Sequence, residues 1–216
     1  MPLPSPAPRK LIHTRAIACQ GYEREDGLWD IEAHLTDTKS VVHTRHHGGR
    51  ERQPGQPVHD MWLRVTIDLD MKIHEIEAIT DEGPYPVCGN ITPNFKALAG
   101  LTIGPGWRKQ IAERVGGVKG CTHLVELLGP VATTAFQTAG SKKANDLQLA
   151  HRLKIGKPPK PRDPSAPPRK PYMLDSCYSW ASDSEVARRW VPQFYTGPDA
   201  EAVREAAKGK DIELDG

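Results

Sequence analysis

Long apolar runs are absent from this 216-residue sequence, and so is any segment with the features of a secretion signal. A bilayer span takes about 20 consecutive apolar residues, and the Pro-rich stretch 1–10 has no apolar core. The hydrophobic fraction is 38% and the mean hydropathy is −0.55, values typical of a globular chain. We therefore expect a soluble, cytoplasmic protein that does not associate with membranes.

Closely spaced cysteines are also absent, since Cys19, Cys88, Cys121 and Cys177 include no C-x-x-C pair. Disulfides rarely persist in a reducing compartment, so these residues are expected to be small buried side chains, metal ligands or nucleophiles. The sequence has no phosphate-cradling glycine loop, nucleophile elbow or dinucleotide-binding fingerprint. A nucleotide cofactor is therefore not expected.

Charge is distributed unevenly, although the net charge is only +2. Residues 151–172 contain seven Lys and Arg against one Asp, and residues 59–82 contain seven Asp and Glu against two Lys and Arg. The basic stretch fits a solvated linker, and it is also suited to an acidic protein partner or to the acidic strands of the same chain. Nucleic acid is the less expected partner.

Alternating apolar residues predict four strands in the first half of the chain. The predicted ranges are residues 10–22, 28–35, 61–69 and 73–80, which pair as two hairpins. After residue 88 the apolar period lengthens to that of helices, predicted over residues 93–101, 107–115 and 121–137, with a kink at Gly129-Pro130. This order predicts an α+β fold, a four-stranded antiparallel sheet with helices on one face.

The domain organisation follows from composition. Residues 1–150 are expected to form a single α+β domain. Residues 151–171 form a basic, Pro-rich linker, because seven prolines lie between residues 157 and 171. Residues 172–198 regain apolar and aromatic side chains and are expected to dock on the domain as a C-terminal segment, and residues 199–216 are expected to form a helical tail.

One segment carries a family resemblance. Residues Gly21–Leu35 read G-Y-E-R-E-D-G-L-W-D-I-E-A-H-L and resemble the opening signature of a bacterial family known only as a domain of unknown function. Segments His59–Arg64, Gly120–Leu124 and Leu174–Cys177 extend the resemblance over most of the chain. Because the activity of that family is not known, this resemblance implies no activity.

Residues 58–138 resemble a second family, the iron–sulfur cluster assembly scaffolds. The predicted hairpin leads to Tyr85-Pro86-Val87-Cys88-Gly89, and a basic loop leads into a helix at Cys121, in the order of the scaffold's later cysteines. Where the scaffold has its first cysteine, this sequence has Val58-His59-Asp60. The resemblance implies a scaffold-like fold and a modified metal site.

The predicted site combines Cys88, Cys121 and His123 with His59 or Asp60. Cys88 follows a strand, and Cys121 stands where a helix begins and unpaired backbone N–H groups favour a thiolate. Zinc or iron accepts such a mixture of sulfur, nitrogen and oxygen ligands. Residues two apart in a helix point away from each other, so Cys121 and His123 can share a metal only if Cys121 lies outside the helix, at its cap.

Other candidates and functions stay open at this point. His43, His46 and His47 lie in a loop better suited to an anion, and Cys177 with Asp175 reaches the site only if the C-terminal segment docks. The leading function is a cytoplasmic metal-binding protein of scaffold-like fold. The alternatives are a small metal- or cysteine-dependent enzyme acting on a small metabolite in a catabolic pathway, and a non-catalytic interaction module that uses the basic stretch.

Overall fold

The computed structural model describes residues 3–44, 51–142, 145–146, 170–171 and 173–207. The chain divides into two compact units, Met1–Gly156 and Lys157–Gly216. In the described residues, no helix combines the length and the apolar character needed to cross a membrane.

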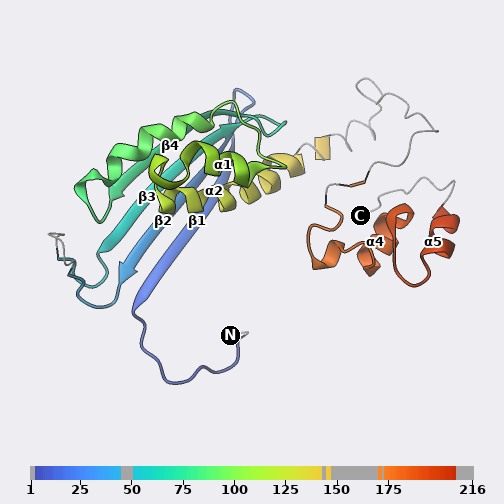
Figure 1. The fold of residues 1–216 in the computed structure, drawn as a ribbon, viewed down its shortest axis with the longest axis horizontal. Helices are drawn as coiled ribbons and strands as arrows, with labels where there is room; N and C mark the ends of the chain where they lie inside the picture. The colour runs from blue at the N-terminus through green and yellow to red at the C-terminus, as the bar shows by residue number, and fades with distance from the viewer. Residues whose placement is uncertain (1–2, 45–50, 143–144, 147–169, 172, 208–216) are drawn as a thin grey trace. The chain divides into compact units, whose positions relative to one another are not determined.

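The first unit contains one antiparallel sheet of four long strands (Figure 1). The strands are β1 (His13–Glu23), β2 (Trp29–Lys39), β3 (Pro57–Ile67) and β4 (Ile73–Glu82), arranged in the order β1-β2-β3-β4. The predicted α+β fold is confirmed. Strand β2 continues four residues beyond the predicted end at residue 35, and β3 begins four residues before the predicted start at residue 61, so these two boundaries were wrong.

Helical elements follow the last strand and lie together on one face of the sheet (Figure 1). They are η1 (Pro86–Leu98), α1 (Trp107–Val115), η2 (Gly117–Lys119), α2 (Thr122–Ala135) and the π-helical turn η3 (Phe136–Gly140). The bounds of α1 are those predicted. The first helical element is a 3₁₀ helix that begins seven residues before the predicted start at Pro93, and α2 continues through Pro130.

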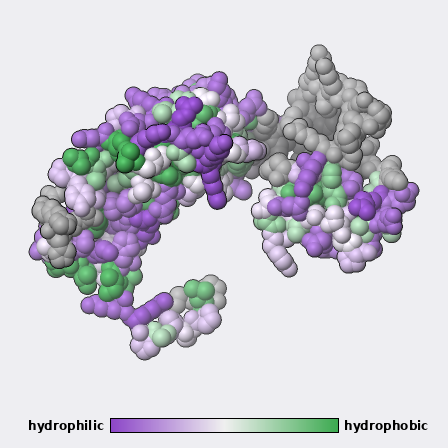
Figure 2. Space-filling view, viewed as in Figure 1, coloured by the Kyte–Doolittle hydropathy of each residue, from purple (hydrophilic) through white to green (hydrophobic). Residues whose placement is uncertain are grey.

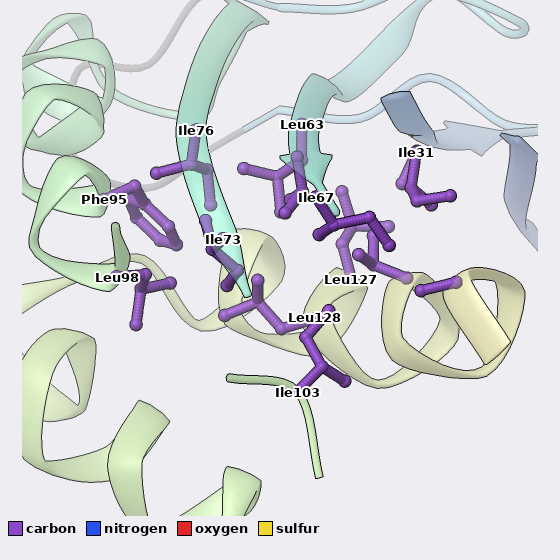
Figure 3. Close-up of a cluster of buried hydrophobic side chains, with 14 of the residues drawn as sticks. Ile31, Leu63, Ile67, Ile73, Ile76, Phe95, Leu98, Ile103, Leu127 and Leu128 are labelled. Atoms are coloured by element: carbon purple, nitrogen blue, oxygen red, sulfur yellow. The ribbon is translucent and has the colours of Figure 1, made fainter. Parts of the chain in front are cut away.

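The core lies between the sheet and these helices. Every second residue of β2 from Trp29 to Asp37 is buried, as the predicted alternation requires. Branched and aromatic side chains from β2, β3 and β4 meet others from η1 and α2, and Figure 3 shows them converging between the two layers. Hydrophilic residues cover most of the first unit's surface visible in Figure 2, with small hydrophobic areas between them.

Truncation of Leu127 should show how far the unit depends on this core. Leu127 lies on α2, is fully buried and belongs to the core cluster. Leu127→Ala is expected to lower the free energy of unfolding by about 2–5 kcal/mol, because it removes buried methyl groups and leaves a cavity. Urea unfolding measures the change. Leu11→Ala is the matched control, since Leu11 is 65% exposed and should change stability by less than about 0.5 kcal/mol.

The second unit has its own small core. Its described elements are η4 (Tyr178–Trp180), α4 (Glu185–Trp190), η5 (Pro192–Phe194) and α5 (Ala200–Ala207). Leu174, Ala187, Val191 and Tyr195 form its buried cluster. The predicted linker lies outside the described residues from 151 to 169, as does the tail beyond residue 207. The docking of residues 172–198 on the first unit stays a prediction.

Candidate metal centre

A row of three polar residues crosses the helix-covered face of the sheet. Arg15 on β1 pairs with Asp37 on β2, and Asp37 pairs with His59 on β3. Residues directly opposite each other in an antiparallel ladder project from the same face. Asp37 is 1% exposed and His59 is 7% exposed, so this row places an acid and a histidine inside the protein.

Asp37 is the centre of this row. Arg15 donates two hydrogen bonds to its carboxylate, from Nε to Oδ1 at 2.9 Å and from Nη2 to Oδ2 at 2.7 Å. His13 and His59 contact the same group at 3.0 and 2.9 Å. Burial by itself raises the pKa of Asp37, but the hydrogen bonds and charge of Arg15, with His59, lower it to about 2. Asp37 is therefore ionised at neutral pH.

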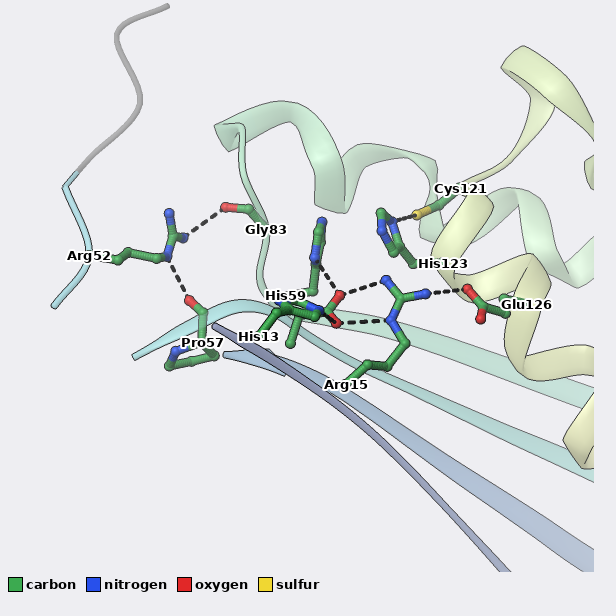
Figure 4. Close-up of polar contacts among 10 residues, drawn as sticks. His13, Arg15, Arg52, Pro57, His59, Gly83, Cys121, His123 and Glu126 are labelled. Carbon is green, nitrogen blue, oxygen red and sulfur yellow. Dashed lines mark hydrogen bonds and ion pairs between the residues drawn. The ribbon is translucent and has the colours of Figure 1, made fainter. Parts of the chain in front are cut away.

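His59 is held in one tautomer by this carboxylate (Figure 4). An ionised carboxylate only accepts hydrogen bonds, so Nδ1 of His59 donates and Nε2 carries the lone pair. Burial and the neighbouring His123 lower the pKa of His59 to about 4, so its ring is neutral at pH 7. Nε2 is buried and has no hydrogen-bond partner among the described residues. Leaving such an acceptor unsatisfied costs about 1–3 kcal/mol.

The start of α2 brings the second group of ligands. A Cβ on Gly120, two residues before α2, would lie 2.1 Å from the carbonyl oxygen of Val115, so only glycine permits the tight approach of the chain to the end of α1. Cys121 then adopts an extended backbone conformation at the N-cap. Its Sγ lies 3.9 Å from Nδ1 of His123. The geometric condition for shared coordination is met, because Cys121 lies outside the helix.

The two groups meet where the ring of His59 contacts the ring of His123. The ring centroids of His59 and His123 are 3.8 Å apart, with the planes inclined by 31°. One ligand atom from each of Asp37, His59 and His123 lies within 4.8 Å of the others. Arg15 bridges the sheet to α2 through an ion pair with Glu126, as Figure 4 shows. This ion pair therefore connects the row Arg15, Asp37 and His59 to the first turns of α2.

A pocket of about 410 Å³ opens beside these rings. Cys88, from the first turn of η1, contributes to its wall together with Cys121 and both histidines. Packing fixes this position, since a Cβ on Gly83 would lie 2.8 Å from Cβ of Cys88. The remaining lining residues are Met61, Pro84, Val87, Ile91, Val118, Gly120 and Thr122, and most are apolar. Four of the five residues predicted for the site therefore line one pocket.

Asp60 is the predicted residue that the structure places elsewhere. It neighbours His59 in β3, and successive strand residues project from opposite faces. Its carboxylate lies 2.6 Å from Nε2 of His34, on the face away from the helices. The acid that lies beside His59 is Asp37, 2.9 Å from its Nδ1, and sequence reasoning missed it. The available signal was the alternation of β2, which places Asp37 in phase with buried Leu35.

The weaker candidates have other surroundings in the part of the chain that the structure describes. His43 forms an isolated backbone bridge with Arg52, while His46 and His47 lie outside the described residues. Cys177 is exposed in the second unit, where Asp175 forms an ion pair with Lys170. Trp107, which follows Gly104-Pro105-Gly106, is buried and donates from Nε1 to the carbonyl of Leu128.

Acid is expected to destabilise the metal-free protein in two steps. The pKa of His59 falls from its ordinary 6.5 to about 4 on folding, so between these pH values only the unfolded chain takes up the proton. Each pKa unit corresponds to about 1.4 kcal/mol, so stability present above pH 6.5 should fall by about 3 kcal/mol as pH approaches 4. The pKa of Asp37 is lowered from 3.8 to about 2, and this shift adds a further loss of stability below pH 4.

Urea unfolding at a series of pH values measures this dependence. His59→Gln has no ionisable group at this position and should flatten the step between pH 6.5 and 4 without removing the later one. Equal slopes in the two proteins would show that His59 does not carry the effect.

Comparison with known proteins identifies the family but no activity. The family model described as "Protein of unknown function (DUF2889)" matches residues 13–137, which include the whole sheet and the candidate site. Neither the curated proteins nor the solved structures contain a significant match, so the resemblance to iron–sulfur scaffolds gains no support from them. The match spans more than half of the chain, and the protein therefore belongs to the DUF2889 family.

Proposed function

We propose that this domain binds a transition metal, with zinc the best fit, through Nε2 of His59, a ring nitrogen of His123 and the thiolate of Cys121. The observation that carries the proposal is the buried, unpartnered Nε2 of a neutral histidine. A metal-binding histidine usually donates its other ring N–H to a carboxylate, which fixes the tautomer and orients the ring. The bond from His59 to Asp37 has this arrangement.

Asp37 is assigned to orientation rather than to coordination. Its two oxygens already accept hydrogen bonds from Arg15, with His13 and His59 also in contact. Direct coordination by Asp37 would require some of these bonds to break. The lone pair on Nε2 of His59 is available without any such loss, so we place the metal on that side of the ring.

The ligand types favour zinc. Nitrogen and sulfur donors suit zinc, with Zn–N of about 2.0 Å and Zn–S of about 2.3 Å. A tetrahedron with these bonds separates its nitrogen and sulfur ligands by roughly 3.5 Å, and the Cys121–His123 distance of 3.9 Å is close to that value. Cys88, in the same pocket, is suited to the fourth position. Iron also accepts these ligands and is the alternative metal.

Cobalt titration tests the proposal, because Co²⁺ replaces Zn²⁺ in such sites and reports its ligands by absorption. The untagged, reduced chain is expected to bind one Co²⁺ and to show a thiolate-to-cobalt charge-transfer band. Cys121→Ser should weaken that band, and Cys121→Ser combined with Cys88→Ser should lose it. Cys177→Ser, at an exposed cysteine of the second unit, should keep it. A chain that binds no cobalt, or binds it without thiolate absorption, would contradict the assignment.

A second candidate function is catalysis at the same metal, and the adjoining pocket favours it. Its volume of about 410 Å³ and apolar walls offer room for a small substrate beside the ligands. A zinc ion with an open position would lower the pKa of bound water toward neutrality and make it a nucleophile. Azide should then change the spectrum of the cobalt form. A site closed by Cys88 would leave the spectrum unchanged, and Cys88→Ser would restore the response.

A further inference from the structure

The sheet face opposite the helices has a regular arrangement of side chains. The helical elements of the first unit lie on the other face (Figure 1), and no described segment of residues 3–142 covers this one. Ladder pairing places residues from β2, β3 and β4 in rows. One row is His34, Trp62 and Ile79, and the next is Glu32, Arg64 and Glu77.

An apolar strip lies in the middle of this face. Trp62 is 38% exposed and Ile79 is 53% exposed, although both are large apolar side chains. The His34 ring stacks on Trp62 with centroids 3.6 Å apart and planes inclined by 6°. The hydrogen bond from His34 to Asp60 holds that ring in place. The indole is therefore a preorganised surface rather than a loose side chain.

A groove of about 340 Å³ runs beside the strip. Its walls include Trp62 and Ile79 together with Glu77 and Asp81, and the ion pair of Arg64 with Glu32 also lines it. An apolar floor with carboxylates at its edge suits a Lys or Arg side chain, whose aliphatic stem packs on apolar surface while its charged head reaches polar groups. The face of an indole also attracts such a cation.

The charge of the whole face points to the same ligand. Arg64 is its one strongly basic residue within β2, β3 and β4, and it is paired with Glu32 and Glu77. Glu75 and Asp81 have no ion-pair partner among the described residues. The acidic residues of this face are Asp30, Glu32, Asp60, Glu75, Glu77 and Asp81. An anionic partner such as nucleic acid would be repelled here.

We propose that this open face binds a Lys- and Arg-rich polypeptide segment, with one cationic side chain in the groove beside Trp62. Its stem lies on Trp62 and Ile79, and its head group meets Glu77 and Asp81. The remaining acidic rows attract the rest of the segment and speed its association. This binding function is separate from the metal site and does not depend on it, because the two lie on opposite faces of the sheet.

Binding of a fluorescein-labelled oligolysine peptide to the full chain, followed by fluorescence anisotropy at physiological salt, tests the proposal. Trp62→Ala changes no charge and is expected to weaken binding about fivefold to tenfold through loss of the cation–π contact and stem packing. Trp62→Phe keeps an aromatic face and should retain most of the affinity. Asp81→Asn should weaken binding by a similar factor, whereas the matched control Glu113→Gln, on the exposed surface of α1, should leave it unchanged.

Four results would overturn the proposal. The first is that the peptide fails to bind the unmodified chain. The second is that Trp62→Ala binds as well as the unmodified chain, and the third is that Glu113→Gln loses as much affinity as Asp81→Asn; either would reduce the interaction to diffuse attraction. The fourth is that replacement of the Lys and Arg residues between 152 and 170 by Gln greatly strengthens peptide binding. The chain's own basic stretch would then compete for the face, and an external partner would be the wrong occupant.

Discussion

His59→Ala is expected to lower the affinity of the chain for zinc by about a hundredfold or more. The substitution removes a nitrogen ligand, and even the loss of a residue that only orients a ligand typically costs 10–100-fold. The remaining ligands, His123 and Cys121 with Cys88, cannot hold the ion in a closed set of four protein ligands. Competition with a chromophoric chelator measures the affinity in the untagged, reduced protein.

The matched control for this experiment is His74→Ala. His74 lies on the neighbouring strand β4, where it is exposed and paired with Asp68. Its loss should leave zinc affinity within about twofold of the unmodified chain, since it has no part in the proposed site. If both variants lose affinity equally, zinc binds to scattered surface histidines and not to His59. If neither loses affinity, the ligands lie elsewhere.

Asp37→Ala is expected to lower the free energy of unfolding of the metal-free protein by about 2–4 kcal/mol at pH 7. It leaves the buried Nδ1–H of His59 without an acceptor and removes one of the two ion-pair partners of Arg15. An unsatisfied buried polar group costs about 1–3 kcal/mol, and breaking a buried ion pair costs more. Urea unfolding measures the change, and Asp81→Ala, an exposed acid on β4, should shift stability by less than about 0.5 kcal/mol.

A double substitution separates the two contributions of Asp37. Asp37→Ala combined with His59→Ala should be less destabilising than the sum of the single variants, because the orphaned imidazole is gone. Additive effects would mean that the bond between these residues contributes nothing to folding. Asp37 would then be a buried acid held by Arg15 alone, and its role in orienting His59 would have no support.

Much of the fold could be predicted from apolar periodicity. The alternation in residues 28–35 and 61–69 identified β2 and β3, and the 3.6-residue period identified α1 with the observed bounds. The predicted end of β2 was wrong because Thr36–Lys39 is polar and its sequence is typical of a loop. Those residues stay in the sheet because β1 and β3 supply Arg15 and His59, which neutralise and bond Asp37. That compensation comes from distant strands and is invisible to a local pattern.

The site was predictable only in part, because some of its residues are marked by local features and others are brought together by strand pairing. A cysteine after a hairpin and another at a helix start are local features, and both cysteines line the pocket. Whether His59 or Asp60 faces that pocket depends on the phase of β3, which becomes clear only when Met61, Leu63 and Val65 are placed in the core. Asp37 and His13 reach the site through strand pairing across more than 20 residues, which no spacing in the sequence indicates.

X-ray absorption at the zinc edge of the untagged, zinc-loaded chain tests the metal assignment most directly. The expected first shell has nitrogen at about 2.0 Å and sulfur at about 2.3 Å, with the imidazole scattering pattern of two histidines. Cys121→Ser should remove one sulfur, and Cys88→Ser should show whether a second is present. A shell of oxygen and nitrogen alone, or a chain that retains no zinc after dialysis, would contradict the proposed centre.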